Sequence, residues 1–206
     1  MSLSKPPLKI KKNQITALIL SGGRGSRMGD IDKGLLMFKN KPLIEHVIER
    51  VSSQVSNIVI SCNRNIEEYR KFGFPIVRDD VDDFAGPLRG ILSAYSLIST
   101  PFTMVVPCDV PFLPANLVQR LTDHPQPFEV SCCHDGEREQ SLIFIAQTSI
   151  LPSIENNLLN DKRSVHHWIS QRHTVWTDFG DMFEKKVFRN LNAPDDMTDA
   201  SSQIKP

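Results

Sequence analysis

The chain has 206 residues, 40% of them hydrophobic, and its 24 lysines and arginines balance its 24 aspartates and glutamates. This length suits a single domain, because one core usually serves roughly 50 to 250 residues. The neutral charge disfavours a general nucleic-acid or membrane-surface binder, which usually carries a basic excess, and no apolar run approaches the roughly 20 residues that span a bilayer.

The first segment in chain order, residues 1–14, is rich in lysine and proline and lacks an apolar signal-peptide core. We interpret it as a disordered leader before a single domain of residues 15–206. The sequence has four cysteines: Cys62, Cys108, Cys132 and Cys133. They show neither C-x-x-C spacing nor a zinc pattern with histidines. We therefore expect reduced thiols and a cytoplasmic protein.

Short apolar runs then alternate with segments of helical periodicity. The predicted strands are Ile15–Leu20, Asn57–Ser61, Pro75–Arg78, Thr103–Val106, Phe128–Cys132 and Leu142–Ala146. The predicted helices are Pro42–Val55, Ile66–Phe72, Gly86–Leu97, Pro114–Leu121, Ser149–Leu159, Ser164–Gln171 and Pro194–Ser201. This alternation is typical of an α/β fold with a mostly parallel central sheet. Asp135-Gly136 predicts a hairpin turn between the last two strands, and a second-substrate role for Arg138 is the alternative interpretation of that loop.

A glycine-rich turn follows the first predicted strand and reads LSGGRGSRMGDIDKG over residues 20–34. Its glycines can adopt positive φ and bring backbone N–H groups close to an anion. The residues concerned are Gly22, Gly23 and Gly25, with the cations Arg24, Arg27 and Lys33 around them. The P-loop pattern G-x-x-x-x-G-K-[ST] is absent, and the dinucleotide pattern G-x-G-x-x-G fails by one residue. The turn therefore predicts a site for the phosphates of a single nucleotide, with an ordinary surface turn as the alternative.

Polar residues also follow the next three predicted strands, at the edge where such sheets bind ligands. We expect Asp109, after the fourth strand, to hold Mg²⁺, because this ion commonly takes one or two carboxylates plus substrate phosphates. A capped turn is the alternative for this residue. Asn63 and Asp79, after the second and third strands, are candidates for binding a base or ribose, or are turn formers.

Two cations of the glycine-rich turn, Lys33 and Arg27, indicate which reaction the turn could support. A lysine ammonium acts as a point charge, whereas the arginine fork binds two oxygens. Transfer of a nucleotidyl group spreads negative charge over the α-phosphate and the departing pyrophosphate, and fixed cations stabilise that charge. Both residues, together with Asp109, are therefore candidate catalytic groups.

Several motifs occur in order along the chain: Leu20-Ser21-Gly22-Gly23, Arg27-Met28-Gly29, Asp32-Lys33-Gly34, Gly86-Pro87-Leu88, Pro107-Cys108-Asp109-x-Pro111, Asp135-Gly136-Glu137-Arg138 and Asn190-Leu191-Asn192-Ala193-Pro194. From about Ile15 to about Asp196, this set resembles the molybdenum cofactor guanylyltransferases. The resemblance implies a three-layer Rossmann-like nucleotidyltransferase fold. It also implies transfer of GMP from GTP, with Mg²⁺, to the phosphate of molybdenum-bound molybdopterin, with release of pyrophosphate.

The resemblance also implies residue roles and partners. The implied GTP-binding residues are Leu20, Ser21, Gly22, Gly23, Lys33, Ser61, Asp79 and Asp109. Asp109 would also bind Mg²⁺, and Asn190 and Asn192 would lie toward the pterin. The implied partners are GTP, molybdenum-bound molybdopterin and proteins that deliver or receive the cofactor, without nucleic acid or membrane.

Three positions depart from the family pattern. Ser21 stands where alanine is frequent, and Asp30 stands where a second glycine is frequent, which adds a negative charge beside the phosphates. Ser61 stands where asparagine is frequent, which leaves guanine selectivity open. The alternatives are therefore a cytidylyltransferase acting on molybdopterin or another phosphorylated acceptor, and a non-catalytic nucleotide-binding module.

Overall fold

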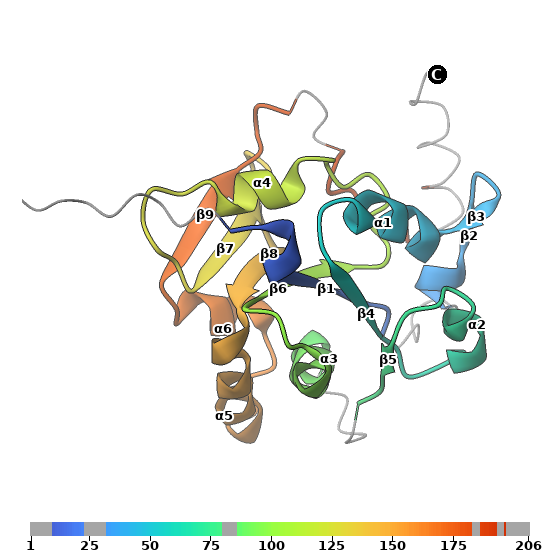
Figure 1. The fold of residues 1–206 in the computed structure, drawn as a ribbon, viewed down its shortest axis with the longest axis horizontal. Coiled ribbons are helices and arrows are strands. Elements are labelled where there is room, and N and C mark those ends of the chain that lie inside the picture. The colour runs from blue at the N-terminus through green and yellow to red at the C-terminus, as the bar shows by residue number, and fades with distance from the viewer. Residues whose placement is uncertain (1–9, 23–31, 80–85, 183–185, 193–195, 197–206) are drawn as a thin grey trace, which may run out of the picture.

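A seven-stranded sheet forms the centre of the computed structural model (Figure 1), which describes residues 10–22, 32–79, 86–182, 186–192 and 196. The strand order is β5-β4-β1-β6-β8-β7-β9. The bounds are β1 Ile15–Leu20, β4 Asn57–Ser61, β5 Ile76–Val77, β6 Phe102–Pro107, β7 Val130–His134, β8 Glu139–Gln147 and β9 Thr174–Asp178. Strand β8 runs antiparallel to both neighbours and the other pairs are parallel. The mostly parallel sheet predicted from the sequence is confirmed.

Helices cover both faces of this sheet and produce three layers. The helix bounds are α1 Leu43–Ser52, α2 Ile66–Arg70, α3 Pro87–Ala94, α4 Leu117–Thr122, α5 Ile154–Leu159 and α6 Val165–Ser170. Figure 1 shows α1 and α4 above the sheet and α3, α5 and α6 below it. Successive strand residues point to opposite faces. Ile19 therefore joins the core with α1 and α4, whereas Leu18 and Leu20 join the core with α3, α5 and α6.

Helix limits differ from the sequence prediction mainly where the backbone tightens. Helix α3 ends at Ala94 and continues as a 3₁₀ turn, η3 Tyr95–Leu97. The segment before α5 is also 3₁₀, η4 Thr148–Ser153, with Pro152 inside it. Proline lacks the N–H that an α-helix needs in its interior, so the α-helix begins only after it. The predicted last helix, Pro194–Ser201, lies outside the described residues except for Asp196.

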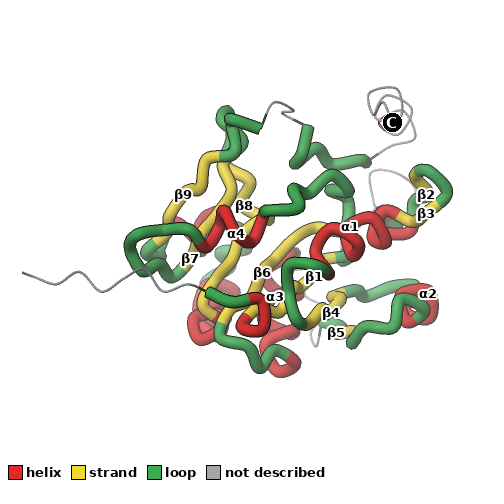
Figure 2. Tube along the Cα trace, turned by 45° about the horizontal axis from the view of Figure 1, so that its top comes forward, coloured by secondary structure: helices red, strands yellow, loops and turns green. Residues whose placement is uncertain are grey.

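Two β elements were missed by the sequence analysis. Strand β9 pairs in parallel with β7 along its whole length, although its sequence, TVWTD, has only a short apolar pattern. A small antiparallel hairpin joins β2 Met37–Phe38 to β3 Lys41–Pro42, and Figure 2 shows it beside α1. Its two turn residues, Lys39 and Asn40, both have positive φ, as a two-residue turn of type I′ requires.

The folded domain begins before the predicted boundary. Ile10 packs against the core, and η1 Lys12–Gln14 forms a single 3₁₀ turn in which the Lys11 N–H donates to Gln14 Oε1 at 2.9 Å. Residues 10–14 are thus part of the fold rather than of a disordered leader, because an apolar side chain anchors them. Residues 1–9 lie outside the described residues.

Candidate functional site

The carboxyl ends of β1, β4 and β6 lie side by side. Leu20 is in register with Ser61 on β4 and with Pro107 on β6. The pairing continues past the strands, because Ser21 N–H donates to the Ser61 carbonyl at 2.8 Å and Cys108 N–H donates to the Leu20 carbonyl at 3.0 Å. The start of the glycine-rich turn is therefore held between two strand ends, as predicted.

Asp109 follows β6 and is the buried acid of this edge, with 6% of its surface exposed. Its Oδ1 accepts a hydrogen bond from Asn190 Nδ2 at 3.1 Å, and its carbonyl accepts from Leu191 N–H at 2.9 Å. Lys33 Nζ lies 3.6 Å from Oδ2. Burial raises the pKa of Asp109 above its usual value, although Lys33 and Asn190 lower it. The carboxylate is thus held in a fixed place largely removed from water.

Lys33 connects this acid to the C-terminal part of the chain. It begins a short 3₁₀ turn, η2 Lys33–Leu35, and its side chain is 46% exposed. Its ammonium donates to Asn192 Oδ1 at 2.5 Å, and Asn192 N–H donates to Asp196 Oδ2 at 2.9 Å. The predicted pair Lys33 and Asp109 is therefore brought together, with Asn192 completing one side.

Asn190 and Asn192 lie on the Asp109 and Lys33 side of the site. The family resemblance implies a position toward the pterin for both residues, and no sequence pattern predicts these contacts. No local sequence signal relates Asn190 to Asp109, because 81 positions separate the two residues. Contact with the pterin stays a prediction for these two residues.

Asn63 and Asp79 form a second polar group beyond the ends of β4 and β5. Asn63 Nδ2 donates to Asp79 Oδ2 at 2.7 Å, and Asp79 N–H donates to Asn63 Oδ1 at 2.9 Å. A Cβ placed on Gly22 would lie 3.7 Å from Asn63 Nδ2, so the amide borders the start of the glycine-rich turn. The two residues that the sequence offered for a base or ribose therefore bind each other at this edge.

Ser61 is directed away from that group. It is 2% exposed, and a Cβ on Gly90 of α3 would lie only 2.6 Å from Ser61 Oγ. Its side chain is therefore packed beneath α3, while its carbonyl holds Ser21. A nucleotide contact through Ser61 stays a prediction, and the geometry favours Asn63, two residues after β4, as the polar side chain that faces the site.

Ser21 places a buried hydroxyl beside Tyr69 and Cys108. Its Oγ is buried, and hydrogen bonding by this side chain lowers the pKa of both Tyr69 and Cys108, although burial raises both more strongly. The hydroxyl is thus engaged within the protein, and a contact between Ser21 and GTP stays a prediction. Gly23 and Arg27, with Asp30, lie outside the described residues, and their roles stay predictions.

The four cysteines do not take part in bridges. All are free and buried, and burial raises the pKa of Cys62 to about 11. The prediction of reduced thiols is confirmed for the structure.

No helix among the described residues has the length and apolar character to cross a membrane.

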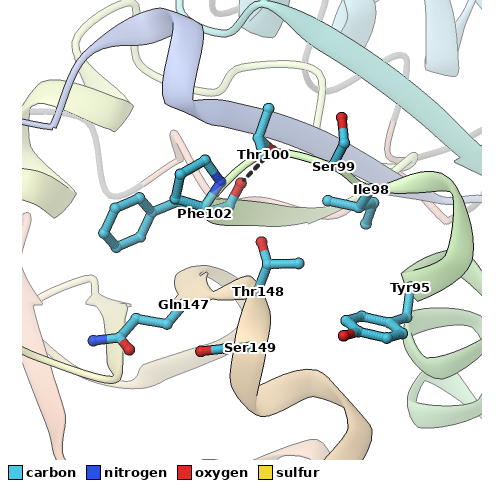
Figure 3. Close-up of a pocket in the computed structure, with 9 residues that line it drawn as sticks. Tyr95, Ile98, Ser99, Thr100, Phe102, Gln147, Thr148 and Ser149 are labelled. Carbon is cyan, nitrogen blue, oxygen red and sulfur yellow. Dashed lines mark hydrogen bonds between the residues drawn. The ribbon is translucent and has the colours of Figure 1, made fainter.

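A separate hollow of about 450 Å³ lies at the opposite end of the sheet (Figure 3). It lies where β6 begins at Phe102 and β8 ends at Gln147, and Thr148 and Tyr95 are among its lining residues. Its described lining contains hydroxyl, amide and apolar side chains but no charged one. It therefore lacks the cations that a triphosphate needs.

The chain is similar to known proteins over most of its length. Residues 17–175 match the family described as MobA-like NTP transferase domain. Molybdenum cofactor guanylyltransferase from Pasteurella multocida is 37% identical over 179 residues, which cover 86% of this chain and 94% of the relative. The enzyme of that name from Shewanella loihica is 36% identical over 193 residues, covering 93% and 97%.

A solved structure with a similar fold is molybdopterin-guanine dinucleotide biosynthesis protein A from Archaeoglobus fulgidus. The TM-score is 0.71 with 23% sequence identity, and the similarity covers 91% of this chain and 97% of the other. At this identity the likeness concerns the fold. It agrees with the three-layer arrangement and the mostly parallel sheet described above.

Proposed function

Because the chain belongs to the MobA-like NTP transferase family, we propose that it transfers GMP from GTP to the phosphate of molybdenum-bound molybdopterin. The products are the guanine dinucleotide cofactor and pyrophosphate. The chain is a nucleotidyltransferase enzyme by family. The observation that carries the reaction is the pairing of Lys33 with the buried carboxylate of Asp109, beside the glycine-rich turn.

The strand order supports one orientation for GTP. Asp79 follows β5 and Asp109 follows β6, and three strand steps separate them in the order β5-β4-β1-β6. Neighbouring strands lie about 4.8 Å apart, so the two acids are roughly 14 Å apart along the sheet edge. A nucleotide can therefore extend across the strand ends, with its base at Asn63 and Asp79 and its phosphates at Lys33 and Asp109.

The reaction needs no covalent enzyme intermediate. An oxygen of the acceptor phosphate forms a bond to the α-phosphorus of GTP, and the bond from that phosphorus to the bridging oxygen breaks. The electron pair leaves with pyrophosphate. Negative charge increases on the α-phosphate and the leaving group, and Lys33 is placed to stabilise it. Ser21 would contact the nucleotide at the start of the glycine-rich turn, where its N–H donates to the Ser61 carbonyl.

The residues present fit Mg²⁺ held mainly by its substrate. No group of three or more metal-ligating side chains occurs among the described residues, so a complete protein cage is not formed there. Asp109 provides one hard carboxylate, and this ion commonly binds one or two carboxylates, substrate phosphates and water. When bound, Mg²⁺ would neutralise phosphate charge. Asp109 would hold it, and Asn190 would fix the orientation of that carboxylate.

The reaction is tested by the Asp109→Ala variant. Pyrophosphate release from GTP with molybdenum-bound molybdopterin should fall by at least about 100-fold, because charge stabilisation of the transition state is lost. Asp123→Ala is the matched control, since that aspartate is exposed and caps the end of α4. If the chain were a non-catalytic nucleotide-binding module, neither the wild type nor Asp123→Ala would release pyrophosphate. Full turnover by Asp109→Ala would remove this residue from the mechanism.

Delivery of molybdopterin by one protein and collection of the product by another are part of the proposal, as is a cytoplasmic location. The nucleotide and the acceptor define the two small-molecule substrates.

A further inference from the structure

The Tyr69 hydroxyl lies between the two loops that carry Lys33 and Asp109. Tyr69 belongs to α2 and is completely buried. Its hydroxyl donates to Asp32 Oδ1 at 2.5 Å, and Asp32 directly precedes Lys33. A buried hydroxyl on a rigid ring thus contacts Asp32, the residue directly before η2, which we call the Lys33 turn.

The same carboxylate is bound a second time by α2. Asn65, which precedes the helix, donates from Nδ2 to Asp32 Oδ2 at 3.0 Å. Both oxygens of Asp32 are therefore held by one short segment of the chain. Two bonds to a planar carboxylate restrict its rotation as well as its position, so the start of η2 is fixed relative to α2.

Gly34 shows how closely these parts approach. A Cβ built on Gly34 would lie 2.4 Å from Tyr69 Oη and 3.2 Å from Cys108 Sγ. The first distance is too short for any real contact, and the atom in the way is held by a buried ring. Cys108 directly precedes Asp109. The Lys33 turn, Tyr69 and the Asp109 loop are therefore packed against one another at a point that has no room for a side chain.

We propose that Tyr69 is a positioning residue that acts through Asp32 to hold Lys33 opposite Asp109. This inference rests on the proposed function, in which Lys33 stabilises charge that develops during transfer. The lysine side chain is long and 46% exposed, so its backbone anchor determines how often the ammonium lies within reach of Asp109. Displacement of a reacting or stabilising group by about 1 Å can reduce a rate by about 100-fold.

The Tyr69→Phe variant removes the hydroxyl and keeps the ring. We expect kcat to fall by about tenfold while the dissociation constant for GTP changes by less than about threefold, because the lost interaction acts mainly in the transition state. Tyr95→Phe is the matched control, because Tyr95 is 40% exposed and lies at the opposite end of the sheet. If the hydroxyl were only structural, Tyr69→Phe would lower Tm and leave kcat of the folded enzyme unchanged.

Gly34→Ala provides a second, independent readout. In the wild-type background its methyl group pushes against Tyr69 Oη and should lower both Tm and kcat. In the Tyr69→Phe background the nearest remaining atoms are at 3.2 and 3.3 Å, so the added methyl should cost less. The two changes should therefore be non-additive in Tm and kcat. Additive effects would contradict a direct contact between these positions.

The position of Lys33 can also be followed without substrate. After reductive ¹³C-methylation, the Lys33 signal, assigned with Lys33→Arg, should shift in Tyr69→Phe and not in Tyr95→Phe. An unchanged signal together with an unchanged kcat would overturn the inference. If the wild-type enzyme released no pyrophosphate from GTP, the proposed function would fail instead, and the Lys33 signal would still decide whether Tyr69 positions this side chain.

Discussion

At the scale of single residues, the choice of base depends on which polar side chain faces the site. Asn63 binds both the carboxylate and the N–H of Asp79, whereas Ser61 is packed beneath α3. Guanine has two neighbouring N–H donors on its Watson–Crick edge, and an ionised carboxylate has two acceptor oxygens. A carboxylate held in one orientation by Asn63 can therefore favour guanine over cytosine.

We expect Asn63→Ala to reduce the preference for GTP over CTP by about fivefold to tenfold, because a hydrogen bond contributes about 1 kcal/mol. The measurement is the dissociation constant of each nucleotide with Mg²⁺. Asn160→Ala is the control, because Asn160 is exposed and its side-chain amide donates to the Asn156 carbonyl in α5. An unchanged ratio would argue against Asn63, and tighter binding of CTP than GTP by the wild type would favour the cytidylyltransferase alternative.

At the scale of elements, the β7–β8 hairpin shows how one side chain fixes a turn. Asp135 Oδ1 accepts from the N–H groups of Glu137 and Arg138 at 2.8 and 2.6 Å, and Oδ2 accepts from Gln140 Nε2 at 2.7 Å. Burial opposes ionisation of Asp135, but these hydrogen bonds outweigh it and lower its pKa. Gly136 has a φ of 93°, a conformation that favours glycine. The predicted hairpin turn is confirmed.

The pH dependence follows from that lowered pKa. In the unfolded chain an aspartate titrates near pH 4, whereas in the fold Asp135 stays ionised to lower pH. Its contribution to stability is therefore present above about pH 4 and is lost as the pH falls through the folded pKa. Asp135→Ala should reduce the free energy of unfolding by about 1–2 kcal/mol at pH 7.

Denaturant unfolding of wild type and Asp135→Ala at several pH values checks this prediction. The difference between the two proteins should narrow as the pH falls below about 4. Asp123→Ala is the control for general acid destabilisation, because that aspartate is exposed at the end of α4. A difference that stayed constant down to pH 3 would show that the hairpin does not depend on the charge of Asp135.

At the scale of the whole molecule, two cores lie on the two faces of the sheet and have different relations to the site. Trp168 is fully buried in the core with α3, α5 and α6, and its indole N–H donates to Ser153 Oγ at 3.1 Å. Tyr69 and Cys108, which adjoin the site, belong to the opposite core. Loss of packing around Trp168 should therefore reduce stability without changing the geometry of Lys33 and Asp109.

Trp168→Ala should lower the free energy of unfolding by about 3–5 kcal/mol and Tm by roughly 6–20 °C in a chain of this size. The kcat of the folded enzyme at 25 °C should remain near the wild-type value. Trp176→Ala is the matched control, because that tryptophan is only partly buried and stacks on His166. Equal losses of stability from both variants would contradict the assignment of Trp168 to the core.

The sequence by itself determined the main elements and the chemistry of the strand ends. The mostly apolar runs of β1 and β4 define these strands to the residue, because nearly all of their positions are buried on both faces of the sheet. It also provided Asp109, because a polar residue directly after such a run lies at the ligand edge of a parallel sheet, and Lys33, as a cation of the glycine-rich turn that follows β1. Strand β9 was missed because its stability comes from pairing with β7 rather than from its own short pattern.

Only the tertiary structure decided which of these side chains meet. It buried Ser61 under Gly90, turned Asn63 toward Asp79, and brought Asn190 and Asn192 to Asp109 and Lys33. It also placed the Tyr69 hydroxyl on Asp32. Local apolar periodicity determines helices and strands, but contacts between residues far apart in the chain depend on how layers pack, which no local pattern contains.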